Sequence, residues 1–335
     1  MTAALETQIQ NALEAVNIRS ATSFSWFGDL SPNVSAVARR AMGETLMREY
    51  LCYQLQMRLY SDFYCKGSAT PVSQPRNMFR RAATTPFIEM LSAANTGTGA
   101  RESGWSVVSV DRDMVTVERD GLRVWIRRED TYAATEDTVS PGQLRAVRFP
   151  KELLKLSPGF YMALGNEGLP IEPDRLVVRF YWNLRAEDAP TLIKHATQLL
   201  NENQIPFRLK VANDPAYYDR CDAAVLYVHR TDYEQVVPMV RRILVDLGGN
   251  LQKATPVFTK VLAPGLGLAE EPAESGDSFG MDRCRIFAEA IVRIHERGVT
   301  RATDRMAIVD EVFAEAGINP STPYLNPGSP DRYLF

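Results

Sequence analysis

Several segments in the second half of the chain alternate large apolar residues with polar ones. They are RLVVRFYWNL (175–184), PFRLKVA (206–212) and AAVLYVHR (223–230), followed by VFTKVL (257–262). A period of two is typical of β-strands, whose successive side chains point to opposite faces of a sheet. Apolar residues at helical spacing lie between and after these segments, at 189–204, 233–249, 279–298 and 302–316. This order predicts an α+β fold in which an antiparallel or mixed sheet packs against helices.

The first hundred residues show a helical pattern instead. Leu5, Ile9 and Leu13 recur at helical spacing, and a short helix is expected at 77–94, after a loop rich in Gly, Ser and Pro at 66–76. The segment NTGTGARESG (95–104) has the composition of a connection. We therefore expect a mostly helical N-terminal region, 1–100, and an α+β domain, 101–335, that carries the site. A longer helical run from 34 to 60 is expected to use the stripe Val37, Ala41, Leu46, Tyr50, Tyr53 and Met57.

Beyond residue 100 the period changes to two. WSVVSV, MVTVER and LRVWIRR are separated by short turns, which predicts a three-stranded meander. The segment APGLGLAEEPAESGDS (263–278) is expected to be a mobile loop beside the site, because its glycine spacing lacks the pattern of a nucleotide-binding loop. The C-terminal tail is rich in proline but keeps large apolar residues, so we expect it to pack back on the body.

Composition excludes some classes of partner. The chain has 38 Lys+Arg and 41 Asp+Glu, a formal net charge of -3, so no basic excess indicates a nucleic-acid partner. Its start lacks the basic and apolar segments of a signal peptide, and no apolar run is long enough to cross a membrane. We expect a cytoplasmic protein, although export by a dedicated apparatus stays open. The four cysteines lack metal-binding spacing and are expected to be core thiols: Cys52, Cys65, Cys221 and Cys284.

The polar faces of the expected strands carry the candidate site. If the strands pair, their cationic and hydroxyl groups form one surface without a carboxylate, which suits a phosphate or another oxyanion. The alternative is an ordinary solvated sheet face, and periodicity alone does not decide between them. The residues concerned are Arg179, Tyr181, Arg208, Lys210, Tyr227, His229 and Lys260.

The remaining motifs are weaker. Arg283, in the helical start FGMDRCR, could meet an anion or could pair with Asp282 or Asp277. The three histidines lie on separate elements, and no Ser or Cys nucleophile motif accompanies them, so a hydrolytic triad is unsupported. No kinase motif is present, so the chain is not expected to make a phosphoester itself.

Six segments give the chain a family resemblance. They are SFSWFGDLSP, RFYWNLR, PFRLKVANDPAYYDRCDAAVLYV, FTKVLAPGLGLAEEP, SFGMDRCR and TPYLNPGSPDRY. They resemble the HopA family, known as type III effectors of plant pathogens and as stand-alone proteins in cyanobacteria and actinobacteria. The resemblance is strongest from residue 174 to the C-terminus.

The resemblance implies an activity. Family members in biosynthetic clusters resemble the lyase partner of a separate phosphotransferase. The pair dehydrates Ser and Thr in ribosomal precursor peptides of class V lanthipeptides and thioamitides (RiPP biosynthesis). The family is also distantly similar to phosphothreonine lyases, in which a lysine takes the α-proton, a histidine protonates the leaving phosphate and arginines hold it.

Carried onto this chain, the resemblance makes Lys210 the base and Arg179 a phosphate contact. Further phosphate contacts would come from Arg208, Arg220, Lys260 and Arg283. The chain departs from the pattern at the acid, because Tyr181 stands where a histidine is expected. Tyr227, Lys260 and His229 are the substitutes that stay open.

The expected function is therefore a phosphoserine/phosphothreonine lyase. Elimination needs no metal or other cofactor, because phosphate is already an activated leaving group. The implied partners are a phosphorylated precursor peptide and a separate phosphotransferase. Two alternatives stay open: an effector that binds a partner without catalysis, and a companion that only presents the peptide to the phosphotransferase.

Overall fold

The computed structural model describes residues 1–31, 34–71, 85–132, 138–154, 156–169, 176–272 and 276–335. In these residues it shows a mixed α+β protein with three antiparallel sheets, which confirms the predicted fold class. The largest sheet has seven strands in the order β14-β15-β11-β13-β12-β10-β9. Their bounds are β9 Glu152–Leu153, β10 Phe160–Leu164, β11 Val177–Trp182, β12 Phe207–Ala212, β13 Ala224–His229, β14 Lys260–Ala263 and β15 Leu266–Glu270.

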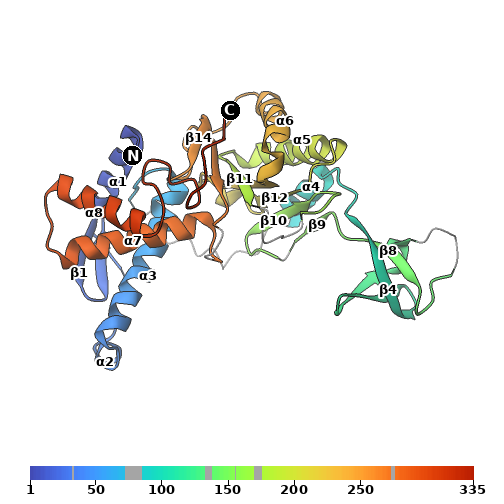
Figure 1. Ribbon diagram of the computed structural model, residues 1–335, viewed down its shortest axis with the longest axis horizontal. Helices are drawn as coiled ribbons and strands as arrows, with labels where there is room; N and C mark the ends of the chain where they lie inside the picture. Colours follow the sequence, from blue (N-terminus) through green and yellow to red (C-terminus); the bar gives the residue numbers. More distant parts are fainter. Residues whose placement is uncertain (32–33, 72–84, 133–137, 155, 170–175, 273–275) are drawn as a thin grey trace.

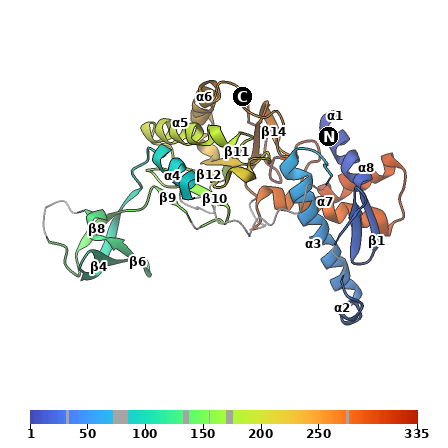
Figure 2. The ribbon, with the colours of Figure 1, turned by 180° about the vertical axis from the view of Figure 1, so that it is seen from behind.

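Two helices cover one face of this sheet. The helices are α5 (Ala189–Glu202) and α6 (Tyr233–Asp246), and both views show them side by side along β11 and β12 (Figures 1 and 2). Phe180 of β11 stacks on Tyr233 of α6 with ring centroids 5.9 Å apart. Because side chains alternate along a strand, Arg179 and Tyr181 point to the opposite face.

The two ends of the chain form a helical layer together. The N-terminal part consists of α1 (Ala3–Ala15), α2 (Ala36–Ala41), α3 (Glu44–Asp62) and the short turn η1 (Tyr64–Lys66). A small sheet of β1 (Val16–Ser20), β2 (Ser23–Trp26) and β3 (Asp29–Leu30) lies between α1 and α2 in the sequence. The C-terminal helices are α7 (Phe279–Glu296) and α8 (Ala302–Glu315). Their buried residues and those of the central sheet belong to one hydrophobic core.

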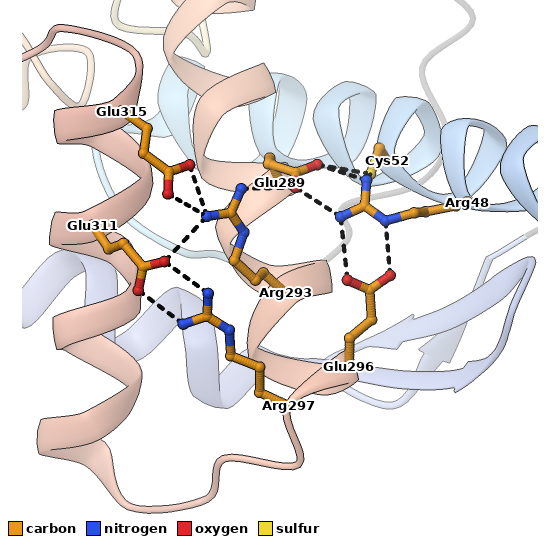
Figure 3. Close-up of polar contacts among 8 residues, drawn as sticks. All are labelled: Arg48, Cys52, Glu289, Arg293, Glu296, Arg297, Glu311 and Glu315. Atoms are coloured by element: carbon orange, nitrogen blue, oxygen red, sulfur yellow. Dashed lines mark hydrogen bonds and ion pairs between the residues drawn. The ribbon is translucent and has the colours of Figure 1, made fainter.

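An ionic network joins three of these helices (Figure 3). Arg48 of α3 donates to Glu289 at 2.7 Å and to Glu296 at 2.7 Å, both on α7. Arg293 of α7 reaches Glu315 of α8 at 2.7 Å. Because these charged groups are half-exposed, we expect their ion pairs to add little to the free energy of folding. Their main effect would be to fix the orientation of the three helices.

The face of α3 that packs inward differs from the predicted one. The buried stripe is Leu51, Leu55 and Leu59. The expected run from 34 to 60 is helical but is interrupted between α2 and α3 at Met42 and Gly43. Helix α3 carries two apolar stripes, and packing against α7 selects the second. Four residues of the predicted stripe are exposed instead: Val37, Leu46, Tyr53 and Met57.

A small β-module, residues 101–148, has a core of its own. Its sheet has the order β6-β5-β4-β8-β7, built from β4 (Arg101–Asp111), β5 (Met114–Arg119), β6 (Leu122–Arg127), β7 (Thr131–Tyr132) and β8 (Leu144–Arg148). Figures 1 and 2 show it at one end of the molecule, apart from the other elements. The predicted meander is confirmed as β4–β5–β6. Helix α4 (Thr85–Ala94) and the N-terminal helices α1 and α3 contribute to the main core. The module's separate core consists of Trp105, Val107, Val115, Val117 and Val147.

The segment expected to be a mobile loop contains a strand, so that expectation was wrong for 266–270. All five residues of β15 are buried between β14 and β11. A Cβ at Gly267 would lie 2.7 Å from Thr259 Oγ1, so the glycine serves close packing here rather than a turn. The C-terminal tail packs back as predicted: Tyr324, Leu325 and Tyr333 are buried.

Other expectations concern single features. The four cysteines are free, and Cys65, Cys221 and Cys284 are buried, as expected of core thiols. The predicted helix at 77–94 is α4 from residue 85 onward, and its first part and residues 72–76 of the preceding loop lie outside the described residues. No helix in the described part of the chain is long and apolar enough to cross a membrane.

Candidate active site

Strand register places the candidate residues in two rows on the sheet face opposite α6. In the first row Tyr227 of β13 is paired with Arg179 of β11 on one side and with Arg208 of β12 on the other. In the second row Val225 separates Tyr181 of β11 from Lys210 of β12. The structure therefore brings together five of the predicted site residues: Arg179, Tyr181, Arg208, Lys210 and Tyr227.

The first row holds a tyrosine between two guanidinium groups. The Arg179 and Arg208 Cζ atoms lie 5.2 Å and 5.7 Å from the centre of the Tyr227 ring. Arg179 is buried and pairs with Glu271, which follows β15. Arg208 is half-buried, and no carboxylate among the described residues pairs with it. Arg208 is thus the guanidinium in the row that is most available to an anion.

Lys210 presents a desolvated amine. Its Nζ lies 3.8 Å from the centre of the Phe160 ring on β10, and it makes no hydrogen bond or ion pair with another described residue. Burial lowers the pKa of Lys210 to about 8, with help from the nearby charges of Arg220 and Arg179 and against the opposing charge of Asp222. A substantial fraction of the amine is therefore neutral just above neutral pH.

Arg220 lies beside Lys210 but is already occupied. It is buried, pairs with Asp222 through two hydrogen bonds and donates to Tyr60 Oη at 3.0 Å. Burial acts to raise the pKa of Asp222, but Arg220 and Lys210 outweigh it and hold that pKa below its usual value. Because Arg220 and Asp222 already bind each other, we expect them to adjust the charge around the Lys210 amine rather than to bind a ligand.

Two tyrosines could supply a proton. Tyr181 is fully buried against Tyr64 and Phe279, and burial raises its pKa to about 12 despite the opposing charge of Arg179. Tyr227 is half-buried, and burial also raises its pKa, while Arg179 and Arg208 act to lower it. Tyr227 is the more accessible donor. His229 is the next residue along β13 on the same face and is buried.

Lys260 and Arg283 do not join this cluster, which corrects the expectation for both. Lys260 is paired with Leu268, which is itself paired with Phe180, so Lys260 belongs to the opposite face, and its Nζ is 2.7 Å from Asp331. Arg283 is 1% exposed and donates to the carbonyls of residues 323 and 325 at 2.7 Å and 2.9 Å. Both cations hold the C-terminal tail.

The face is not free of carboxylates, contrary to the sequence-based expectation. Asp222 and Glu271 were missed because they lie just outside the strands, where a period of two gives no information. Phe160 was missed because β10 lies in a segment punctuated by Pro and Gly. No group of three or more His, Cys, Asp or Glu side chains in the described ranges is arranged to hold a metal ion.

Comparisons with known proteins identify the family. The model of the HopA1 effector protein family matches residues 153–325, which include β10 to β15 and α5 to α8. The effector protein from Pseudomonas syringae pv. tomato strain DC3000 is 18% identical, with a TM-score of 0.47 over 83% of this chain and 95% of that one. The effector protein from Pseudomonas syringae pv. syringae strain 61 is 15% identical, with a TM-score of 0.49 over 97% of this chain and 98% of that one. No curated protein matches the sequence. Because the family match spans more than half of the chain, the protein belongs to the HopA1 effector protein family.

Proposed function

We propose that the protein is a phosphoserine/phosphothreonine lyase acting on a phosphorylated peptide. The amine of Lys210 takes the α-proton of the phosphorylated residue, and the C–H electrons form the Cα=Cβ bond. The Cβ–O bond breaks, and phosphate leaves with that electron pair. The products are dehydroalanine or dehydrobutyrine in the peptide and inorganic phosphate.

The observation that carries the proposal is the state of Lys210. Its amine has no hydrogen-bond or ion-pair partner among the described residues, and its pKa is lowered to about 8. A general base works best when its pKa lies near the working pH, and such a group typically contributes about 10²–10⁴-fold in rate. A surface lysine with an ordinary pKa would be protonated and inactive in this role.

The guanidinium groups support the same chemistry. Removal of the α-proton builds negative charge on the peptide carbonyl, next to the two charges of the phosphate. Fixed cations in a partly dry site stabilise such charge more effectively than water does. We assign Arg208 to contact the phosphate, and Arg179, on the other side of Tyr227 in the sheet, adds its charge. Tyr227, between the two arginines, is the group we assign to protonate the leaving phosphate.

The rest of the proposal concerns the setting. The substrate would be a ribosomal precursor peptide phosphorylated by a separate phosphotransferase in the cytoplasm, as in lanthipeptide-like RiPP biosynthesis. The residues named above supply the base, the acid and the anion contacts, so the scheme uses no metal or other cofactor.

The test is an elimination assay on a phosphothreonine peptide, with the phosphotransferase and any leader peptide supplied. Expected are release of inorganic phosphate, loss of phosphoric acid by mass spectrometry and a new UV absorbance from the dehydro residue. Lys210→Met should abolish all three. Lys194→Met is the matched control, because Lys194 is exposed on α5 and lies outside the cluster. Equal rates for the Lys210→Met variant and the native protein would overturn the assignment of the base.

A second candidate is a binding protein that holds a phosphorylated peptide without catalysis. The observation that favours it is that Arg179 and Arg220 already have carboxylate partners, Glu271 and Asp222. The same assay separates the two: a phosphopeptide that binds in an Arg208-dependent manner and remains intact would support binding alone.

A further inference from the structure

The β-module has one edge that is open to another strand. Strand β6 ends the order β6-β5-β4-β8-β7, and its six residues make it the longest edge strand in the described part of the chain. The opposite edge, β7, has two residues in the described part of the chain. Exposed edge strands are templates for pairing, and natural proteins usually keep them short or covered.

The turn between β5 and β6 fixes which backbone groups reach this edge. Asp120 and Gly121 have φ values of +51° and +79°, and they form a two-residue loop between the paired residues Arg119 and Leu122. The pair that flanks such a loop is hydrogen-bonded, and the hydrogen-bonded pairs then recur at every second residue. The even-numbered residues of β6 therefore direct their N–H and C=O groups toward β5.

The far end of the hairpin keeps the same alternation, because Arg128 N donates to Asp113 O at 2.8 Å. The odd-numbered residues consequently direct their backbone groups away from β5. Those residues are Arg123, Trp125 and Arg127, and no strand among the described residues pairs with them on that side.

The side chains of these three residues share one face of the strand. Trp125 is 76% exposed, whereas the other tryptophans, Trp26, Trp105 and Trp182, are buried. Arg123 and Arg127 flank Trp125, and their side chains are 65% and 73% exposed. Their ion pairs with Glu118 and Glu129 are solvated and weak, so carboxylates of a partner can replace them.

We propose that β6 docks an extended, acidic segment of the peptide substrate, which adds to the β-module as a further strand. The open backbone groups would form the main-chain hydrogen bonds, Trp125 would cover an apolar side chain, and the two arginines would meet acidic ones. The inference rests on the proposed function only in taking a peptide as the substrate.

The attachment of the β-module suits this role. Its two connections are joined by a hydrogen bond from Phe149 N to Ala100 O at 2.7 Å. Thr98 N donates to Asn166 Oδ1 at 2.8 Å, and residue 166 follows β10, the strand that pairs with β12. A peptide held at β6 would thus be tethered near β10, the neighbour of the strand β12 that carries Lys210.

The test uses the full chain and a phosphate-free probe, a ten-residue peptide with Thr at every second position and Glu and Val in turn at the positions between. One face of the bound strand then offers Glu, Val and Glu to Arg123, Trp125 and Arg127. Binding is followed by protection of the tryptophan emission from acrylamide, which reports on Trp125 because the other three tryptophans are buried. A peptide of equal charge with Pro at alternate positions is the control ligand, because it cannot form the ladder. Protection by the first peptide and none by the second is expected.

Arg123→Pro is the decisive variant, because it removes a donor from the open edge without breaking a bond to β5. Affinity measured by anisotropy of the labelled probe should fall about five- to tenfold, through loss of one main-chain bond and one arginine. Leu144→Ser is the matched control: Leu144 is exposed on β8 of the same module, and its replacement should leave affinity unchanged.

Native affinity in Arg123→Pro would overturn the proposal. If that variant loses β-structure by circular dichroism, two other variants decide instead: Trp125→Ala and the double charge reversal Arg123→Glu/Arg127→Glu. Native affinity in both of these would equally overturn the docking proposal. Lys210→Met should bind the probe normally. Because the probe has no phosphate and no turnover is measured, failure of docking leaves the lyase assay unaffected, and failure of the lyase assay leaves docking unaffected.

Discussion

The amine of Lys210 stands 3.8 Å from the centre of the Phe160 ring, and Arg220 Cζ lies 5.7 Å from the same centre. Only Arg220 has an acidic partner, Asp222. A buried lysine next to a permanent cation favours its neutral form, whereas the guanidinium stays charged at all accessible pH values. One aromatic ring thus contacts both a group that can exchange a proton and a group that fixes the local charge.

The pH dependence of elimination should report on this amine. Because the active form is neutral and its pKa is about 8, kcat/KM should rise with pH through about 8 and then level off. Lys210→Arg should lose at least about 10²-fold in rate, since arginine stays protonated. A native profile that is flat between pH 6 and 9 would contradict the role of Lys210.

Arg208 should matter for the phosphate and little for stability. Arg208→Gln removes a half-buried guanidinium that has no described carboxylate partner, so the free energy of unfolding should change by less than about 1 kcal/mol. The value of kcat/KM for a phosphopeptide should fall about tenfold to a hundredfold, the loss expected for one charge-assisted contact. Restoration of charge in Arg208→Lys should recover only part of it, because lysine cannot make a bidentate contact. An unchanged kcat/KM would remove Arg208 from the site.

The central strands and their polar face were predictable from the sequence because a period of two determines which side chains share a face. The side of the sheet on which Lys260 lies was not predictable in this way. The expected strand at 257–262 begins at Lys260, because Phe258 has a φ of +71°, far from the negative values of a regular strand. Its orientation then depends on register with β15, a strand hidden in a glycine-rich segment.

Arg283 shows a second limit of the sequence. A basic residue near the start of a helix suggested an anion site, but folding brings the C-terminal tail across it. Contacts between residues about forty positions apart leave no periodic signal. Asp222 and Glu271 also lack a periodic signal, because both lie in loops just outside the strands.

Arg283 should therefore act on stability. Arg283→Met leaves two tail carbonyls without their donor and removes the buried one of the two arginines that pair with Asp282, at a cost of about 3 kcal/mol in the free energy of unfolding. Arg285→Met is the matched control, because Arg285 shares the partner Asp282 but its side chain is 54% exposed, and it should cost less than about 1 kcal/mol. Urea unfolding measures both. Equal stabilities for the two variants would show that Arg283 does not hold the tail.

The close contact between α7 and η1 can be tested at Gly280. A Cβ at this position would lie 2.6 Å from Tyr64 Cζ and 2.8 Å from Cδ1. The ring cannot yield easily, because Tyr64 is buried between Tyr60, with which it stacks at 5.5 Å, and Tyr181. Helix propensity favours Ala over Gly by about 1 kcal/mol, whereas overpacking costs about 1–3 kcal/mol.

We expect the overpacking to prevail, so Gly280→Ala should lower the free energy of unfolding in urea. It should also lower kcat, because Tyr64 supports Tyr181 on the polar face. Gly43→Ala is the control: nothing lies within 4 Å of its Cβ position at the N-cap of α3, so the change adds no clash. It should cost only about 0.5–1 kcal/mol, because Ala is a poorer N-cap residue than Gly. A stabilised Gly280→Ala variant would mean that α7 can move away from Tyr64. The face that carries Lys210 would then be less rigidly supported than these contacts imply.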